Sequence, residues 1–188
     1  ISMIKKTIQG DLPDVYLLHG DLTDEEMNQM YNHPKVKAHL SFTHGEGFGR
    51  PLLEASFSGK PIIAPISTGQ ADFLDKNYTI EIPHILTKVP TGAFPKEFYN
   101  PEAQWSTVNY GVAGRMMRQV FENYSKFELK GKKQMIVNTQ LFTHEKMSEK
   151  LISIVDKVLE GVPQPVKLKI PSLTKEPTKL KLPTLKRG

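Results

Sequence analysis

The sequence contains no cysteine, which excludes a disulfide framework and thiolate chemistry and is compatible with a reducing compartment. Its apolar runs are all far shorter than the roughly 18–20 residues needed to cross a bilayer. No secretory leader pattern opens the chain. We therefore expect a cytoplasmic protein. The first residue is Ile1 rather than Met, which indicates a processed product or a fragment.

Several ligand-binding patterns are also missing. No G-x-G-x-x-G follows a predicted strand, so the usual dinucleotide fingerprint is not there. No pair of aspartates forms a D-x-D element, and the histidines lack metal-ligand spacing. The sequence therefore predicts no bound metal and no cofactor.

Most of the chain has no excess of positive charge, although the formal net charge is +5. The last 26 residues, 163–188, hold seven basic residues and one acid, so the remainder carries a net charge of −1. A nucleic-acid-binding domain needs a basic surface, and the main part of this chain has no such excess. We expect no nucleic-acid partner.

The basic tail contains an internal repeat. KLKIPSL at residues 167–173 returns twelve residues later as KLKLPTL at 179–185. Alternating lysine and aliphatic residues with one proline per unit favour an extended ribbon over a helix. A solvated linker and a docking peptide for a protein partner are both compatible with this pattern. Attraction to an anionic membrane surface is a weaker alternative, because the basic residues do not follow helical spacing.

Strand-like and helix-like segments alternate along the first half of the chain. Predicted strands lie at residues 15–20, 36–43, 61–65 and 78–82, and predicted helices at 24–33, 50–58, 108–124, 128–140 and 144–159. Residues 84–105 read as a long irregular loop with three prolines. This alternation predicts an α/β fold, a Rossmann-like parallel sheet flanked by helices, followed by the extended basic tail. Ligands of such sheets bind beyond the carboxyl ends of the strands.

The most informative stretch is HGEGFGRPLLEASFSGKPIIAP, residues 44–65. Three glycines, Gly45, Gly47 and Gly49, allow positive φ and a close approach of the backbone to a ligand. Arg50-Pro51 is expected to open a helix whose free N–H groups would attract an anion such as a diphosphate. The helix should bury Leu52, Leu53, Ser56 and Phe57 and end at Gly59.

The run from Glu46 to Glu54, EGFGRPLLE, resembles the E-x7-E signature of retaining, nucleotide-sugar-dependent glycosyltransferases of the GT-B fold. Glycosyltransferase family four is the closest in pattern, and Gly59-Lys60-Pro61 with the strand after it also fits. The resemblance covers residues 15–159. It implies that residues 1–161 form the donor-nucleotide-binding domain, without its first strand, and that residues 162–188 form a separate tail.

The resemblance also implies roles for individual residues. Glu46 would be the catalytic-site acid that contacts the transferred sugar, and Glu54 would accept hydrogen bonds from the ribose hydroxyls. Backbone amides of Gly47, Phe48, Gly49 and Arg50 would bind sugar hydroxyls and phosphate oxygens. His44 would line the site. Each has a simpler alternative: solvated acids for the two glutamates, a surface ion pair for Arg50, and a hydrogen-bonded structural histidine for His44.

The donor substrate would be a UDP- or GDP-linked sugar. A complete GT-B enzyme also has an N-terminal acceptor domain and a basic pair that neutralises the diphosphate, and neither is recognisable in this sequence. The chain alone is therefore expected to be inactive, although part of a retaining glycosyltransferase. The competing hypothesis is a non-catalytic scaffold or binding module that its tail anchors to a larger assembly.

Overall fold

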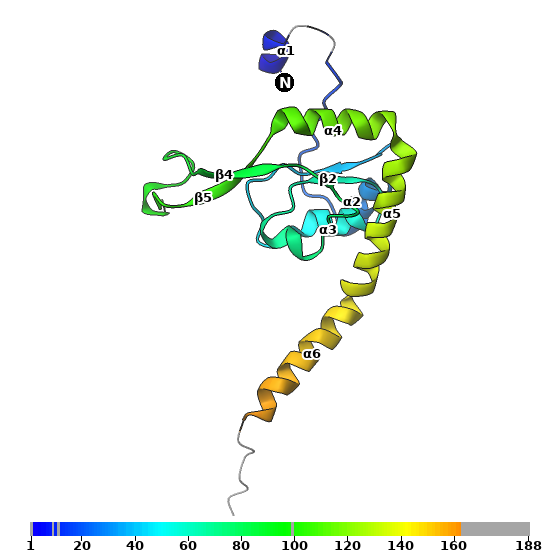
Figure 1. Ribbon diagram of the computed structural model, residues 1–188, viewed down its shortest axis with the longest axis vertical. Helices are drawn as coiled ribbons and strands as arrows, with labels where there is room; N and C mark the ends of the chain where they lie inside the picture. Colours follow the sequence, from blue (N-terminus) through cyan, green and yellow to red (C-terminus); the bar gives the residue numbers. More distant parts are fainter. Residues whose placement is uncertain (1, 9, 11, 99, 163–188) are drawn as a thin grey trace, which may run out of the picture. The chain divides into compact units, whose positions relative to one another are not determined.

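The computed structural model describes residues 2–8, 10, 12–98 and 100–162 (Figure 1). The predicted tail, residues 163–188, lies outside the described residues. The chain divides after Met147 into two units, so the main body and the helix that follows are described separately. The part of the chain that the structure describes contains no helix long and apolar enough to cross a membrane.

A three-stranded parallel sheet forms the centre of the main body. Its order is β1 (His39–Leu40), β2 (Ile62–Ala64) and β3 (Ile80–Glu81). His39 is paired with Ile62, and Ile63 with Ile80. The central strand is buried at every residue, as predicted for a strand covered on both faces. The α/β fold is confirmed, and the sheet is compatible with a Rossmann-like arrangement.

Helices cover both faces of this sheet (Figure 1). On one face, α3 (Arg50–Ser56) packs Leu52 and Leu53 against Ile62 and Ala64. On the other face, α4 (Tyr110–Glu122) packs Ala113 and Val120 against Ile63 and its neighbours. The alternation of side chains along β2 therefore feeds two separate apolar cores. The predicted burial of Phe57 is wrong, because this ring is exposed.

The first long helix, α2 (Asp24–Asn32), begins as its sequence predicts. The Thr23 hydroxyl accepts a hydrogen bond from the Glu26 amide at 3.2 Å. The Glu26 carboxylate accepts one from the Thr23 amide at 2.8 Å, which completes a capping box. The Thr23 amide, and then the Thr23 hydroxyl, donate to this carboxylate and lower the pKa of Glu26.

The predicted helices after residue 108 are also present. After α4 come α5 (Tyr124–Leu141) and α6 (His144–Glu160). Helix α5 carries a buried polar chain: the Gln134 amide donates to Asn138 Oδ1 at 3.0 Å, and the Asn138 amide donates to Ser56 Oγ at 2.8 Å. The apolar stripe of α6 is present, but no residue of this helix is buried.

Two sequence-based expectations about strands are wrong. Residues 84–105 do not form an irregular loop, because β4 (His84–Lys88) and β5 (Gln104–Val108) pair as an antiparallel hairpin. Its prolines lie between the strands, where they interrupt no ladder hydrogen bond. Residues 15–20, predicted as a buried strand, have no regular structure and their apolar side chains are exposed. Near the amino end lies a short helix, α1 (Ser2–Thr7).

Candidate functional site

The carboxyl ends of the parallel strands carry the loops that hold the predicted site residues. The loop after β1 contains His44 and Glu46 and leads directly into α3. The loop after β2 leads into a single 3-10 turn, η1 (Thr68–Asp72). These two loops are bonded to each other, and the parallel topology brings them to the edge of the sheet where ligands of such folds bind.

Thr68 and Gly69 hold the backbone of Glu46 from both sides. The Thr68 hydroxyl accepts a hydrogen bond from the Glu46 amide at 2.9 Å, and the Gly69 amide donates to the Glu46 carbonyl at 3.0 Å. Thr68 has a φ of 51°, a left-handed conformation that costs a threonine energy. The sequence predicts a turn at residues 67–72 that could present backbone amides, but it assigned no role to the Thr68 side chain; a threonine followed by glycine in a loop was the available signal.

The glycine-rich loop leaves backbone donors free. Among the described residues, no group accepts a hydrogen bond from the amides of Gly47, Phe48 or Gly49. Of the three glycines of the motif, Gly49 alone takes a positive φ, 86°. A left-handed residue turns the chain into α3 at Gly49, whereas Gly45 and Gly47 adopt ordinary backbone conformations.

The tip of α3 offers fewer donors than predicted. Pro51 has no N–H, and the amides of Leu52 and Leu53 both donate to the Gly49 carbonyl, at 3.0 and 3.2 Å. The helix itself is only seven residues long. The free amides for a ligand therefore come from the loop before the helix and from Arg50, the first residue of the helix.

The Phe48 side chain serves the fold. Its ring lies 5.5 Å from the ring of Phe73 and 6.3 Å from that of Phe142, measured between centroids. These tilted ring contacts anchor the loop to the apolar core on the α3 face. The Phe48 amide has no acceptor among the described residues, so it is free for the main-chain role that the resemblance implies.

Arg50 and Glu54 form an ion pair on the surface of α3. The Arg50 Nε and Glu54 Oε1 atoms are 2.5 Å apart, and Asp24 lies 4.0 Å from the same guanidinium. Glu54 and its hydrogen bond are the main reason that the pKa of Arg50 is raised. The simpler alternative for Arg50, a surface ion pair, is thus present, and its partner is the second glutamate of the motif.

Two hollows meet at Tyr31. One, of about 320 Å³, is polar and is lined by Asp24, Tyr31, Arg50 and Glu54 among others. The other, of about 260 Å³, is lined by Tyr31, Thr43, Glu46 and Gly49 among others. The two predicted acids therefore lie in adjoining hollows. Sequence reasoning missed Tyr31, which looked only like an inward-facing helix residue.

The Tyr31 hydroxyl has no hydrogen-bond partner among the described residues, although the residue is only 8% exposed. Burial, and then the negative charge of Glu54, raise the pKa of this phenol. The Glu46 carboxylate likewise has no described partner. A neutral hydroxyl and a free carboxylate beside two hollows can donate to and accept from a polyhydroxylated ligand.

His44 is fixed by strand β5 of the hairpin. Its ring stacks on Trp105 with centroids 3.9 Å apart and an interplanar angle of 6°. Its Nδ1 donates to the Ser106 carbonyl at 2.6 Å, which leaves Nε2 without a described partner. The bond at Nδ1 is therefore that of the simpler alternative, a hydrogen-bonded structural histidine.

Four buried polar atoms near these loops have no hydrogen-bond partner among the described residues: Thr43 Oγ1, Ser67 Oγ, Gln70 Oε1 and Ser106 Oγ. Two belong to the loops after β1 and β2, and Ser106 is bonded through its backbone to His44. Buried polar atoms normally find a partner, so a group of unpaired ones marks a place for water or a ligand.

Behind the site, Lys60 of the GKP sequence has a structural role. Its ammonium group donates to the carbonyls of Tyr31 and His33 at 2.6 and 2.7 Å, which caps the end of α2. This holds Tyr31 in place between the hollows. Burial lowers the pKa of Lys60, with a smaller contribution from Lys37.

His39 gives the fold a measurable pH dependence. Burial, and then the charge of Lys60, lower the pKa of His39 from 6.5 to about 4. The folded state thus favours the neutral ring, which contacts Ser58 at 3.0 Å. The stabilisation is full above pH 6.5 and is lost as the pH falls toward 4, because the unfolded chain then binds the proton more tightly.

Between pH 7.5 and 4.5, we expect the free energy of unfolding to fall by about 1–2 kcal/mol more in the wild type than in His39→Gln, after allowance for partial exposure of the ring. Urea unfolding at the two pH values measures this difference. Equal losses in both proteins would contradict it.

The described residues contain no group of three or more His, Cys, Asp or Glu side chains that could hold a metal ion. Comparison of the chain with models of known families gives no match, and a search of curated proteins gives none either.

Proposed function

We propose that this chain is the donor-nucleotide half of a retaining glycosyltransferase and that its site takes a UDP- or GDP-linked sugar. The observation that carries the proposal is the arrangement of the motif's two acids. Glu46 and Glu54 lie in adjoining hollows beside the free amides of residues 47–49, at the carboxyl edge of a parallel sheet. Metal-independent binding of a nucleotide sugar needs this combination of carboxylates for hydroxyls and amides for phosphate.

Each residue then has a role. The Glu46 carboxylate contacts the transferred sugar, and the amides of Gly47, Phe48 and Gly49 donate to phosphate or sugar oxygens. Glu54 accepts hydrogen bonds from the two adjacent ribose hydroxyls. Arg50 must give up part of its contact with Glu54. An exposed pair of this kind contributes little to stability, so the exchange costs little.

Catalysis of sugar transfer needs more cationic groups than these residues supply. Arg50 is the single cation in the two hollows as the structure describes them, and it already faces two carboxylates. Loss of a cationic clamp on a leaving diphosphate costs several kcal/mol of transition-state stabilisation. We therefore expect binding without efficient turnover until an acceptor domain and its cations are provided, in the same polypeptide or by a partner.

A second candidate function is a non-catalytic scaffold of glycosyltransferase shape. The Arg50–Glu54 ion pair favours it, because the acid expected to hold ribose is already paired at 2.5 Å. In this case the two hollows would remain empty of nucleotides. The two candidates differ in one measurable property, which is saturable binding of a nucleoside diphosphate.

Isothermal titration of the full chain with UDP, GDP and their sugars tests the proposal. We expect one of them to bind saturably and Glu54→Gln to weaken the affinity by about 10-fold or more, because hydrogen bonds to a charged acceptor are worth about 1.5–3 kcal/mol. Glu128→Gln is the matched control. It breaks an i,i+4 ion pair with Lys132 on α5, at a similar exposure, outside both hollows.

Wild-type binding that is unchanged by Glu54→Gln would contradict the assigned role of Glu54. A complete lack of binding, also in the presence of an acceptor domain, would favour the scaffold.

A further inference from the structure

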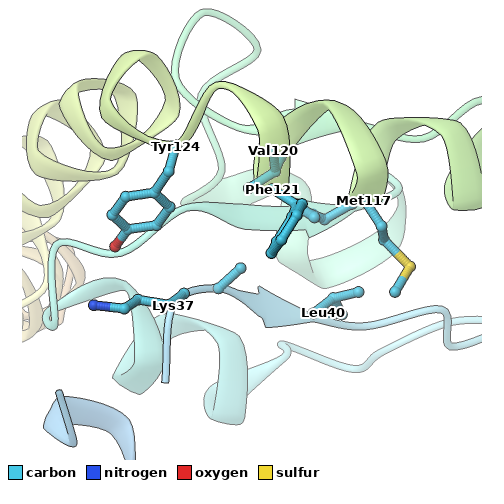
Figure 2. Close-up of a pocket in the computed structure, with 8 residues that line it drawn as sticks. Lys37, Leu40, Met117, Val120, Phe121 and Tyr124 are labelled. Atoms are coloured by element: carbon cyan, nitrogen blue, oxygen red, sulfur yellow. The ribbon is translucent and has the colours of Figure 1, made fainter. Parts of the chain in front are cut away.

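An apolar groove lies between β1 and α4, on the face of the sheet opposite α3. It has a volume of about 410 Å³, and Figure 2 shows its lining residues: Lys37, Ala38, Leu40, Ile63, Met117, Val120, Phe121 and Tyr124. Phe121 is 85% exposed at its rim. Proteins seldom leave a large aromatic ring and a concave apolar surface exposed together, so we expect another segment to bind in the groove.

Strand β1, which borders the groove, has an unpaired edge. Its His39 and Ser41 amides donate to β2, at 2.9 and 3.1 Å. Alternation along the strand turns the amide and carbonyl of Leu40 to the other side, where no described residue bonds to them. An open edge beside an apolar groove has the features of a site for strand addition.

The same chain contains a segment of matching chemistry. Residues 15–18, Val-Tyr-Leu-Leu, favour strand structure and carry no charge. In the structure they form no regular element, and their side chains are 59–85% exposed. Four adjacent apolar residues of this kind suit a strand that is covered on both faces.

The added position is hollowed on its α4 face, where the groove lies beside β1. A strand beside β1 would therefore place alternate side chains, two of residues 15–18, in the groove. A charged side chain would be buried there, whereas residues 15–18 carry no charge.

The connection between the segment and β1 has the correct handedness. Helix α2, which follows the segment, packs beside α3. Since parallel crossovers are right-handed, a strand that reaches β1 through a helix on the α3 face must lie on the side of β1 away from β2. That side is the open edge.

We propose that residues 15–18 dock on the free edge of β1 as a fourth, parallel strand and fill the groove between β1 and α4. In the undocked conformation described here the segment is exposed. Docking orders the sheet as segment, β1, β2 and β3, and it brings the turn at His19 and Gly20 to the edge where the loops of the candidate site lie. The pairing itself does not depend on the proposed function.

Disulfide trapping tests the docking directly, because the chain has no natural cysteine. Four double variants combine Leu40→Cys with a cysteine at position 15, 16, 17 or 18. Met3→Cys with Leu40→Cys reports random encounters, since Met3 is also strongly exposed. A paired strand puts alternate residues on one face, so cross-linking should be strong at two alternate positions and at least about 5-fold weaker at the other two.

The expected products are monomers with an internal disulfide at positions 15 and 17, or at 16 and 18. Disulfide-linked dimers would show exchange between two copies and would overturn the proposal. Equal yields at all four positions, or yields equal to the Met3→Cys control, would overturn it as well. In the unmodified protein, the Leu40 amide should exchange its hydrogen at least about 100-fold more slowly than an unpaired amide; unprotected exchange contradicts docking.

Discussion

Gly131→Ala should lower the free energy of unfolding by about 2–4 kcal/mol, since overpacking against a rigid backbone costs at least about 1–3 kcal/mol. A Cβ on Gly131 of α5 would lie 2.5 Å from the Lys60 carbonyl carbon and 2.6 Å from the Gly59 oxygen. Both atoms belong to the backbone, so α5 or the turn before β2 must move. The turn carries Lys60, which caps α2, so the damage should spread to the helix that holds Tyr31.

Gly114→Ala is the matched control for this prediction. Gly114 lies within α4, and a Cβ there would have no atom within 4 Å. Alanine in an open helical position should raise the free energy of unfolding by about 0.5–1 kcal/mol. Urea unfolding of the two variants therefore should give changes of opposite sign. Equal changes would mean that α5 does not pack on the turn as described.

Gly69→Ala is expected to displace the loop of the candidate site. A Cβ at this position would lie 2.1 Å from the Gly47 oxygen and 2.6 Å from the Phe48 Cα. The hydrogen bond from the Gly69 amide to Glu46 could not survive the shift. We expect a loss of about 2–4 kcal/mol in unfolding free energy, together with a loss of nucleotide binding.

Gly47→Ala is the matched control, because Gly47 lies in the loop that Gly69 contacts. No atom lies within 4 Å of a Cβ on Gly47, and its φ is negative or extended, so the unfolding free energy should change by less than about 0.5 kcal/mol. Urea unfolding and calorimetry on both variants measure the two effects. A stable Gly69→Ala protein with unchanged affinity would show that the two loops are not in contact.

The sequence predicted the elements whose signals are local. The capping box at Thr23 and Glu26 specified the start of α2, and the apolar run before Pro65 specified β2. The helices after residue 108 followed from their periodicity. In the helices, the side chains that form the pattern also stabilise the element they belong to, so no distant partner was needed.

The errors concern features that depend on distant partners. The hairpin of β4 and β5 was missed because its prolines suggested a loop, although they lie outside both strands. Residues 15–20 carry a strong strand pattern, but a strand exists only where a neighbour accepts its hydrogen bonds. The sequence alone does not show whether the edge of β1 is occupied.

For the candidate site, the sequence identified the residues of the motif but not the side chains that surround them. Glu46 and the amides of residues 47–49 are free, as the motif suggested. Thr68, Tyr31 and Trp105 enter only through the fold, from the loop after β2, from α2 and from β5. Their positions relative to the motif result from tertiary contacts.

The most direct test of the central claim follows the backbone amides of Gly47, Phe48 and Gly49 by NMR as a nucleoside diphosphate sugar is added. The proposed function predicts saturable shifts at these three amides, larger than those of the Glu128–Lys132 surface on α5. Shifts that do not saturate, or that are confined to residues outside the two hollows, would contradict the assignment of this loop as a donor-binding site.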